Sequence, residues 1–216
     1  MKKLFIEAKY TGKADIDKIN LDKLPKRIGL VSAVQFVDLV DDISVFLKSK
    51  NKISIIGKGK QKHSCQVLGC DVGSAEKIKD KVDAFLYVGD GSFHPIGVAL
   101  RTDKPVFVFN PCMNHFYELP KEDIENYKRK RKGALLKFLS ADNVGILVST
   151  KPGQHQPMKK LEVLEKKYPK KKFYTFVAET IDINQLENFG FIEAWINTAC
   201  PRLEEDYSLL NISELK

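Results

Sequence analysis

Two cysteines carry the clearest chemistry in this sequence, because each follows an apolar, strand-like run. Cys200 lies in the stretch 196–203, directly before Pro201, and Cys70 lies in the stretch 66–71. A thiol at the end of a buried strand faces a crevice rather than a core. Thiolates are soft ligands that suit zinc or iron–sulfur clusters. Two such thiols in one α/β chain therefore indicate a shared metal or cluster site.

The two remaining cysteines, Cys65 and Cys112, leave several interpretations open. No Cys-x-x-Cys pair occurs in the sequence, so a self-contained zinc ribbon is not expected. In a reducing cytosol the four cysteines are thiols or metal ligands rather than disulfides. Each is equally consistent with a small buried hydrophobic side chain. Cysteines spread one per loop fit a ligand set gathered by folding, such as a 4Fe-4S cluster held by three thiolates with one iron left open.

Polar loops also follow other strand-like runs and offer further candidate contacts. His94, in the loop 89–94, is as consistent with a ligand contact as with a polar turn residue. Gly91 and Gly153 would let a ligand approach the backbone closely. The stretch 57–60 lacks the hydroxyl residue of a Walker-type phosphate loop, and no Gly-x-Ser-x-Gly elbow is present.

The composition favours a globular fold without membrane contact. The chain has 216 residues, of which 43% are hydrophobic and 30% charged. This length fits one large domain or two of about 100 residues. No apolar run approaches the roughly 18–20 residues that span a bilayer, and the N-terminus lacks a signal-peptide core. We therefore expect a cytoplasmic protein.

The net charge of +8 comes largely from lysine clusters at 48–62, 128–132 and 166–172. Such clusters are typical of a nucleic-acid or ribosome-facing surface, or of a solvated face. Aromatic residues are not interleaved with them in a stacking pattern. The solvated face is therefore favoured, and no direct nucleic-acid contact is expected.

Strand-like and helix-like segments alternate along the chain. Strands are predicted at 4–8, 28–33, 53–56, 82–88, 106–109, 144–148, 173–177 and 191–196. Helices or helical turns are predicted at 36–49, 74–81, 95–100, 121–139, 157–167 and 184–188. This alternation predicts an α/β fold with parallel sheets and right-handed crossovers. In such sheets, chemistry gathers at the carboxyl ends of the strands.

The pattern also repeats, which predicts two similar units. The run 28–32 is similar to 144–149, and the run 82–88 is similar to 192–197. We expect a lead-in strand and linker over 1–27. A first α/β unit over 28–118 carries Cys70, and a second unit over 119–216 carries Cys200.

Five stretches together resemble the diphthamide-synthesis family, the 2-(3-amino-3-carboxypropyl)histidine synthases of archaea and eukaryotes. They are residues 29–36, 66–71, 83–95, 145–154 and 197–202. The resemblance implies three similar α/β domains around a 4Fe-4S cluster, with one cysteine from each domain. It also implies reductive cleavage of S-adenosylmethionine and addition of its 3-amino-3-carboxypropyl group to a histidine of translation elongation factor 2.

By this resemblance, Cys70 matches the second-domain cluster ligand and Cys200 the third-domain ligand. The residues expected to line the S-adenosylmethionine pocket are Gln66, Gly91, His94, Gly153 and Gln154. The family's first domain is missing here, and only the run 4–8 resembles its closing strand.

The missing third ligand leaves three interpretations. A separate polypeptide supplies it, or Cys65 or Cys112 takes its place, or the chain is a non-catalytic accessory partner of the catalytic protein. Loss of one domain should expose an apolar face, and a homodimer is the simplest cover for it.

Overall fold

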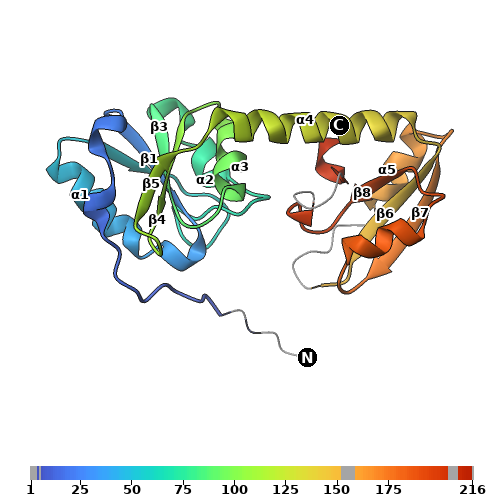
Figure 1. Cartoon of the computed structure of the whole chain (residues 1–216), viewed down its shortest axis with the longest axis horizontal. Coiled ribbons are helices and arrows are strands. Elements are labelled where there is room, and N and C mark those ends of the chain that lie inside the picture. The colour runs from blue at the N-terminus through green and yellow to red at the C-terminus, as the bar shows by residue number, and fades with distance from the viewer. Residues whose placement is uncertain (1–3, 5, 152–158, 204–208, 216) are drawn as a thin grey trace. The chain divides into compact units, whose positions relative to one another are not determined.

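The computed structural model describes residues 4, 6–151, 159–203 and 209–215, and it divides into two compact units (Figure 1). The first unit is Met1–Ile124 and the second is Glu125–Lys216. Each contains a mainly parallel sheet with helices against it. The predicted α/β class with two parallel-sheet units is therefore confirmed.

The first unit is built on a five-stranded sheet in the order β2-β1-β3-β4-β5. Its strands are β1 (Arg27–Ser32), β2 (Ile53–Ile56), β3 (Ala84–Val88), β4 (Val106–Asn110) and β5 (His115–Glu118). The first four pair in parallel, and β5 pairs antiparallel with β4. β3 and β4 are buried along their whole length, as central parallel strands usually are.

Helices of the first unit pack beside this sheet, and the two longest bury apolar side chains. They are α1 (Leu39–Ser49), α2 (Gly73–Glu76) and α3 (Phe93–Thr102), with 3₁₀ helices η1 (Ile16–Lys18), η2 (Leu21–Lys23), η3 (Val34–Phe36) and η4 (Lys79–Lys81). In α1 the buried residues Val40, Ile43 and Leu47 lie three and four positions apart, which is the spacing of one helix face.

The second unit contains a four-stranded sheet in the order β7-β6-β8-β9, and all its pairings are parallel. Its elements are α4 (Lys121–Ser140, which begins before the unit boundary), β6 (Asn143–Ser149), α5 (Lys159–Lys167), β7 (Lys172–Ala178), η5 (Ile183–Asn188), β8 (Ala194–Asn197), β9 (Leu210–Asn211) and η6 (Ile212–Glu214). Phe138 of α4 is fully buried in one apolar cluster. Trp195 of β8 anchors a second cluster with Leu147 and Leu186.

The two sheets repeat each other down to a glycine–aromatic contact. In each sheet, the first strand in chain order is flanked on one side by the second strand, which forms the edge of the sheet, and on the other side by the third strand. Gly29 on β1 lies opposite Phe85 on β3, and Gly145 on β6 lies opposite Trp195 on β8. At both glycines a Cβ atom would run into the partner ring. The repeat seen in the sequence is therefore a repeat of packing.

Three differences from the predicted elements concern strands. The described residues 4 and 6–8 form no strand, and just after them Tyr10 donates its backbone N–H to the Gln35 carbonyl of η3 rather than to a sheet edge. β5 and β9 were not predicted. β5 is a four-residue, half-exposed edge strand and β9 has two residues, too short for a periodic pattern.

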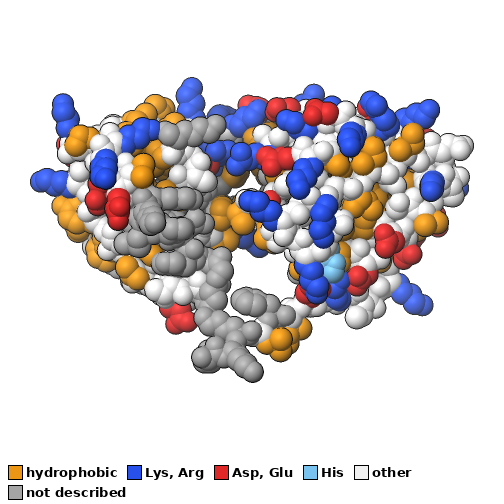
Figure 2. Space-filling view, turned by 180° about the vertical axis from the view of Figure 1, so that it is seen from behind, with side chains coloured by type: hydrophobic (Ala, Val, Ile, Leu, Met, Phe, Trp, Pro, Cys, Tyr) orange, Lys and Arg blue, Asp and Glu red, His pale blue; other side chains and the backbone are white. Residues whose placement is uncertain are grey.

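On the face that Figure 2 shows, basic side chains are spread with acidic ones among them. In the basic run 128–132 of α4, Lys128 pairs with Glu125 and Arg131 pairs with Glu214. These pairs support the interpretation of this run as a solvated helix face. Among the helices that the structure describes, none is both long and apolar enough to span a membrane.

The glycine–aromatic contact predicts a stability effect. Gly145→Ala should lower the free energy of unfolding of the second unit by about 1–3 kcal/mol, because the Trp195 ring must shift. Gly133→Ala in α4 is the control, since no described atom lies within 4 Å of its Cβ position and alanine favours a helix by about 0.5–1 kcal/mol. Trp195 is the only tryptophan, so its fluorescence during denaturation reports on this unit. Equal midpoints for Gly145→Ala and the unmodified chain would contradict the prediction.

Candidate functional site

Cys70 lies at the tip of a tight turn in the loop between β2 and α2. The Leu68 and Asp71 backbones exchange two hydrogen bonds, of 2.8 and 3.0 Å. Asp71 accepts further hydrogen bonds from the Gly73 N–H and from Gln61 Nε2, each at 2.9 Å. The Gly73 N–H is the main cause of the lowered pKa of Asp71. These contacts fix the turn and leave Cys70 exposed at its tip.

The stretch before this turn lies along the end of β1. The Ser32 N–H donates to the Cys65 carbonyl and the Val67 N–H donates to the Ser32 carbonyl, both at 2.9 Å. Gln66 lies between them and is buried, and the Ser74 hydroxyl donates to its carbonyl. The carboxyl end of β1 and the loop that carries Cys70 are therefore joined by backbone hydrogen bonds.

The loop after β3 turns sharply and leads into α3. Gly91 has a φ of 71°, a left-handed conformation that glycine adopts without strain. The Asp90 carboxylate accepts hydrogen bonds from the Gly91 N–H and from Asn110 Nδ2, both at 2.8 Å. His94 follows in the first turn of α3, where its ring stacks on Tyr87 of β3.

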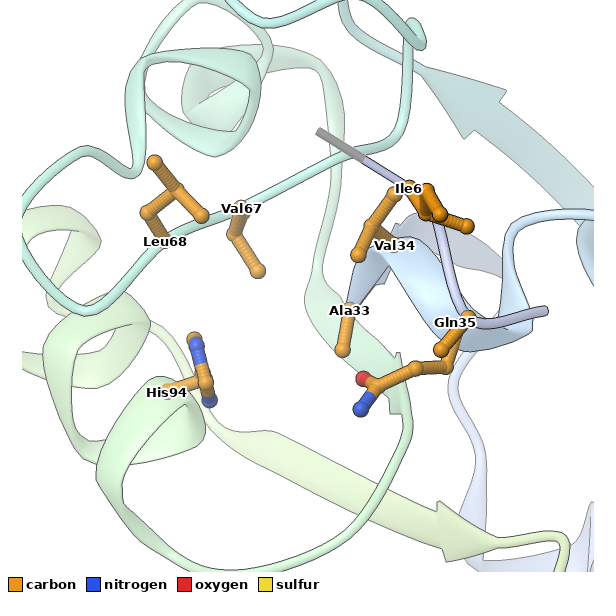
Figure 3. Close-up of a pocket in the computed structure, with 8 residues that line it drawn as sticks. Ile6, Ala33, Val34, Gln35, Val67, Leu68 and His94 are labelled. Carbon is orange, nitrogen blue, oxygen red and sulfur yellow. The ribbon is translucent and has the colours of Figure 1, made fainter. Parts of the chain in front are cut away.

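These loops surround a pocket of about 300 Å³ in the first unit (Figure 3). Its lining residues are Ile6, Ala8, Ala33, Val34, Gln35, Val67, Leu68 and His94. Gln35 and His94 are the polar side chains of this lining, and they point toward each other across the pocket. The pocket thus suits a small ligand with an aliphatic body and hydrogen-bonding ends.

One wall of the pocket comes from the N-terminal segment, which is held by Glu7. The Glu7 carboxylate accepts from Lys62 Nζ at 2.9 Å and lies 3.0 Å from His63 Nε2. The hydrogen bond from Lys62 is the largest cause of its pKa falling to about 2. Ile6 and Ala8, on either side of Glu7, line the pocket.

In the second unit, the Cys200 loop is tied to the sheet by a buried amide. Asn197, at the end of β8, donates from Nδ2 to the Cys200 carbonyl and to Asn211 Oδ1, both at 2.8 Å. Its Oδ1 accepts from the Ala199 N–H. Asn197 is only 1% exposed, whereas Cys200 is half-buried. The loop is therefore fixed while its thiol stays accessible.

The other two cysteines differ in environment. Cys65 is buried, and this burial raises the pKa of its thiol. Cys112 is exposed in a turn where Asn110 Oδ1 accepts from the N–H groups of Cys112 and Met113. Within the described ranges, no group of three or more His, Cys, Asp or Glu side chains is arranged to hold a metal ion.

The predicted cofactor residues fall into two groups. His94 lines the pocket, Gln66 directly precedes the lining residue Val67, and Gly91 lies in the turn before α3, outside the lining. Gly153 and Gln154 lie outside the described residues. Gln35 was not predicted as a site residue, although it lies in a stretch that carries the family resemblance. No local sequence signal marks it, because Gln35 becomes a pocket residue only where the distant stretch 65–67 lies beside the end of β1.

The parallel sheets, with candidate ligand-binding residues in the loops after the strands, are typical of α/β proteins that bind ligands at the strand ends. Comparison with known proteins identifies the family. The family of diphthamide synthesis proteins matches residues 4–209, so the chain belongs to this family. The resemblance given by the five sequence stretches is therefore confirmed.

The relatives are 2-(3-amino-3-carboxypropyl)histidine synthases. The synthase of Pyrococcus horikoshii is 32% identical over 190 residues, which are 86% of this chain and 53% of that protein. Subunit 1 of the Schizosaccharomyces pombe synthase is 31% identical over 190 residues, which are 84% of this chain and 43% of that protein. The chain thus spans about half the length of the curated relatives it matches.

A solved structure shows the same fold. Dph2 from Pyrococcus horikoshii, in a crystal structure with a 4Fe-4S cluster, matches with a TM-score of 0.78 and 28% sequence identity. The match covers 90% of this chain and 57% of that one.

The environments of the cysteines predict their order of alkylation. Cys70 and Cys112 should react with a maleimide first, because both are exposed. Cys65 should react last, since its burial both shields the thiol and lowers its thiolate fraction. Peptide mass spectrometry after short exposures measures each site, and the denatured chain is the control, in which all four should react alike. Fast labelling of Cys65 in the folded chain would contradict the structure.

The ion pair of Glu7 with Lys62 predicts a titration. The Glu7 carboxyl should titrate at about 2, so the stability that this pair contributes is present above pH 4.5 and is lost as the pH falls toward 2. Lys62→Met should raise the pKa of Glu7 toward 4.5, which carbon-13 NMR of the carboxyl measures. Lys60→Met removes the same charge from the same loop and is the matched control. An equal rise in both variants would show that the pairing with Lys62 is not the cause.

Proposed function

We propose that this chain acts in diphthamide biosynthesis, transferring a 3-amino-3-carboxypropyl group from S-adenosylmethionine to a histidine of translation elongation factor 2. One observation carries the proposal. The family match runs over residues 4–209 and includes both loops in which Cys70 and Cys200 follow parallel strands. The relatives' name gives the transferred group and the histidine acceptor. The proposed location is the cytoplasm.

The donor atoms fit an iron–sulfur cluster. Cys70 is exposed and Cys200 is half-buried, so both thiols are accessible to iron. Each lies in a loop fixed by hydrogen bonds, which limits the entropy lost when the thiolate binds. We propose that Cys70 and Cys200 ligate a 4Fe-4S cluster. When bound, such a cluster supplies an electron and an open iron for the reductive cleavage of S-adenosylmethionine.

The pocket of the first unit fits part of that cofactor. Its apolar lining suits an aliphatic chain, and Gln35 and His94 suit the polar groups at the ends of one. We propose that His94, Gln66 and Gly91 contribute to the S-adenosylmethionine site, together with Gly153 and Gln154. Apolar walls also exclude water, which strengthens the hydrogen bonds made inside the pocket.

The third cluster ligand is proposed to come from Cys112 or from another chain. Cys112 is exposed, whereas Cys65 would have to leave a buried position and lose a proton that burial helps it keep. Several relatives are named as subunit 1 of the synthase, so a partner chain is consistent with the family. A second copy of this chain is the alternative source.

Cluster assembly tests the assignment of ligands. Cys70→Ser and Cys200→Ser should each lose most of the iron and acid-labile sulfide taken up in anaerobic reconstitution. The reason is that each substitution removes one of the two cluster ligands that this chain is proposed to supply. Cys65→Ser is the matched control and should keep them, since its thiol is buried. Iron and sulfide analysis, the visible absorption band and cleavage of S-adenosylmethionine measure the outcome.

Reconstitution is repeated with any chain that co-purifies with this one. Uptake of iron that is the same in Cys70→Ser, Cys200→Ser and the unmodified chain would overturn the proposed ligands. If this chain takes up no iron but a partner that co-purifies with it takes up iron and cleaves the cofactor, the chain has an accessory role in binding the catalytic protein instead.

A further inference from the structure

The hydrogen-bonding pattern of His94 is set by a buried tyrosine behind the pocket wall. Tyr87 lies on β3 and is fully buried. Its hydroxyl oxygen lies 3.3 Å from the Asp90 carbonyl oxygen and 3.4 Å from His94 Nδ1. The two rings also stack, with centroids 5.8 Å apart and planes 14° from parallel. The imidazole therefore meets Tyr87 through both its face and its Nδ1 atom.

The phenol has one proton for these two contacts. A carbonyl oxygen only accepts hydrogen bonds, so Tyr87 must donate its proton to Asp90 if both contacts are hydrogen bonds. The phenol oxygen can then only accept from His94, which requires the proton of the neutral imidazole to lie on Nδ1. This arrangement leaves Nε2 in its acceptor form.

A second aromatic side chain limits the tilt of the same ring. Phe93 meets His94 edge to face, with centroids 5.8 Å apart and planes at 76°. Phe93 itself packs against the turn that carries Cys70, where a Cβ atom on Gly69 would overlap its ring. The orientation of His94 is thus coupled by packing to the loop of the proposed cluster ligand.

We infer that Tyr87 is a positioning residue, which holds His94 in the Nδ1–H tautomer so that Nε2 accepts a hydrogen bond from an amino or hydroxyl group of the pocket's ligand. The Gln35 amide faces His94 from the opposite wall and takes the other polar end of that ligand (Figure 3). The identity of the ligand as S-adenosylmethionine rests on the proposed function, but the role of Tyr87 does not.

Nitrogen-15 NMR of the imidazole rings tests this directly in the full chain. At about pH 8.5, where an ordinary histidine is neutral, His94 should show the Nδ1–H pattern. Tyr87→Phe keeps the stacked ring and removes the hydroxyl. It should shift the tautomer ratio roughly fivefold toward Nε2–H, the usual effect of losing one hydrogen bond. The His94→Ala spectrum assigns the signals among the four histidines.

Tyr174→Phe is the matched control, because it removes a phenol that also makes a 3.4 Å hydrogen bond, to Asn143 in the second unit. It should leave the His94 signals unchanged. An Nε2–H pattern in the unmodified chain would overturn the inference even if Tyr87→Phe failed to fold. An unchanged tautomer ratio in folded Tyr87→Phe would overturn it as well.

Calorimetry with S-adenosylmethionine separates this inference from the proposed function. Tyr87→Phe and His94→Ala should each weaken binding roughly fivefold, and the double variant should be no weaker than His94→Ala, since Tyr87 acts through His94. Additive losses would contradict a positioning role. If the unmodified chain and its assembly do not bind S-adenosylmethionine, the proposed cofactor is wrong, and the tautomer measurement alone decides on Tyr87.

Discussion

Parallel strands that are buried on both faces leave only their ends for polar chemistry, and this constraint determines where His94 and Cys200 lie. β3 is apolar and buried throughout, and the polar loop 89–94 begins directly after it. β8 ends at Asn197, whose buried amide fixes the Cys200 loop. Within each unit, the buried strands therefore fix where the loops with the candidate residues begin.

The loops are held in place by a few specific contacts rather than by regular structure. The turn with Cys70 depends on two backbone hydrogen bonds and on Asp71, and it packs on Phe93 at the start of α3. Phe93 and Tyr87 in turn enclose the His94 ring. The turn that carries the Cys70 thiol and the start of α3 that carries the His94 imidazole are thus connected through aromatic packing, so a change in either segment should alter the other.

Many of the strands and helices could be predicted from sequence, because the patterns that indicate them are local. The strand 53–56 and the helix 36–49 follow from apolar runs and spacing, and the structure has β2 and α1 there. The repeat of 28–32 in 144–149 also has a physical basis, since both runs place a glycine against an aromatic ring. Local patterns and internal similarity were sufficient for the α/β class.

What could not be predicted depends on contacts between distant residues. β5 forms by pairing with the edge of β4. β9 forms where Asn211 accepts a hydrogen bond from the Asn197 side chain. Gln35 becomes a pocket residue only when the stretch 65–67 pairs beside the end of β1. The burial of Cys65, five residues from the exposed Cys70, has no sequence signal either.

The central claim is that Cys70 and Cys200 bind iron, while the surroundings of the other residues do not change. Differential alkylation before and after anaerobic cluster assembly in the unmodified chain, with any partner that co-purifies, tests it most directly. The account predicts that both thiols become protected when the cluster forms and react again once a chelator removes the iron. Alkylation of Cys70 and Cys200 at the same rate with and without a bound cluster would contradict it.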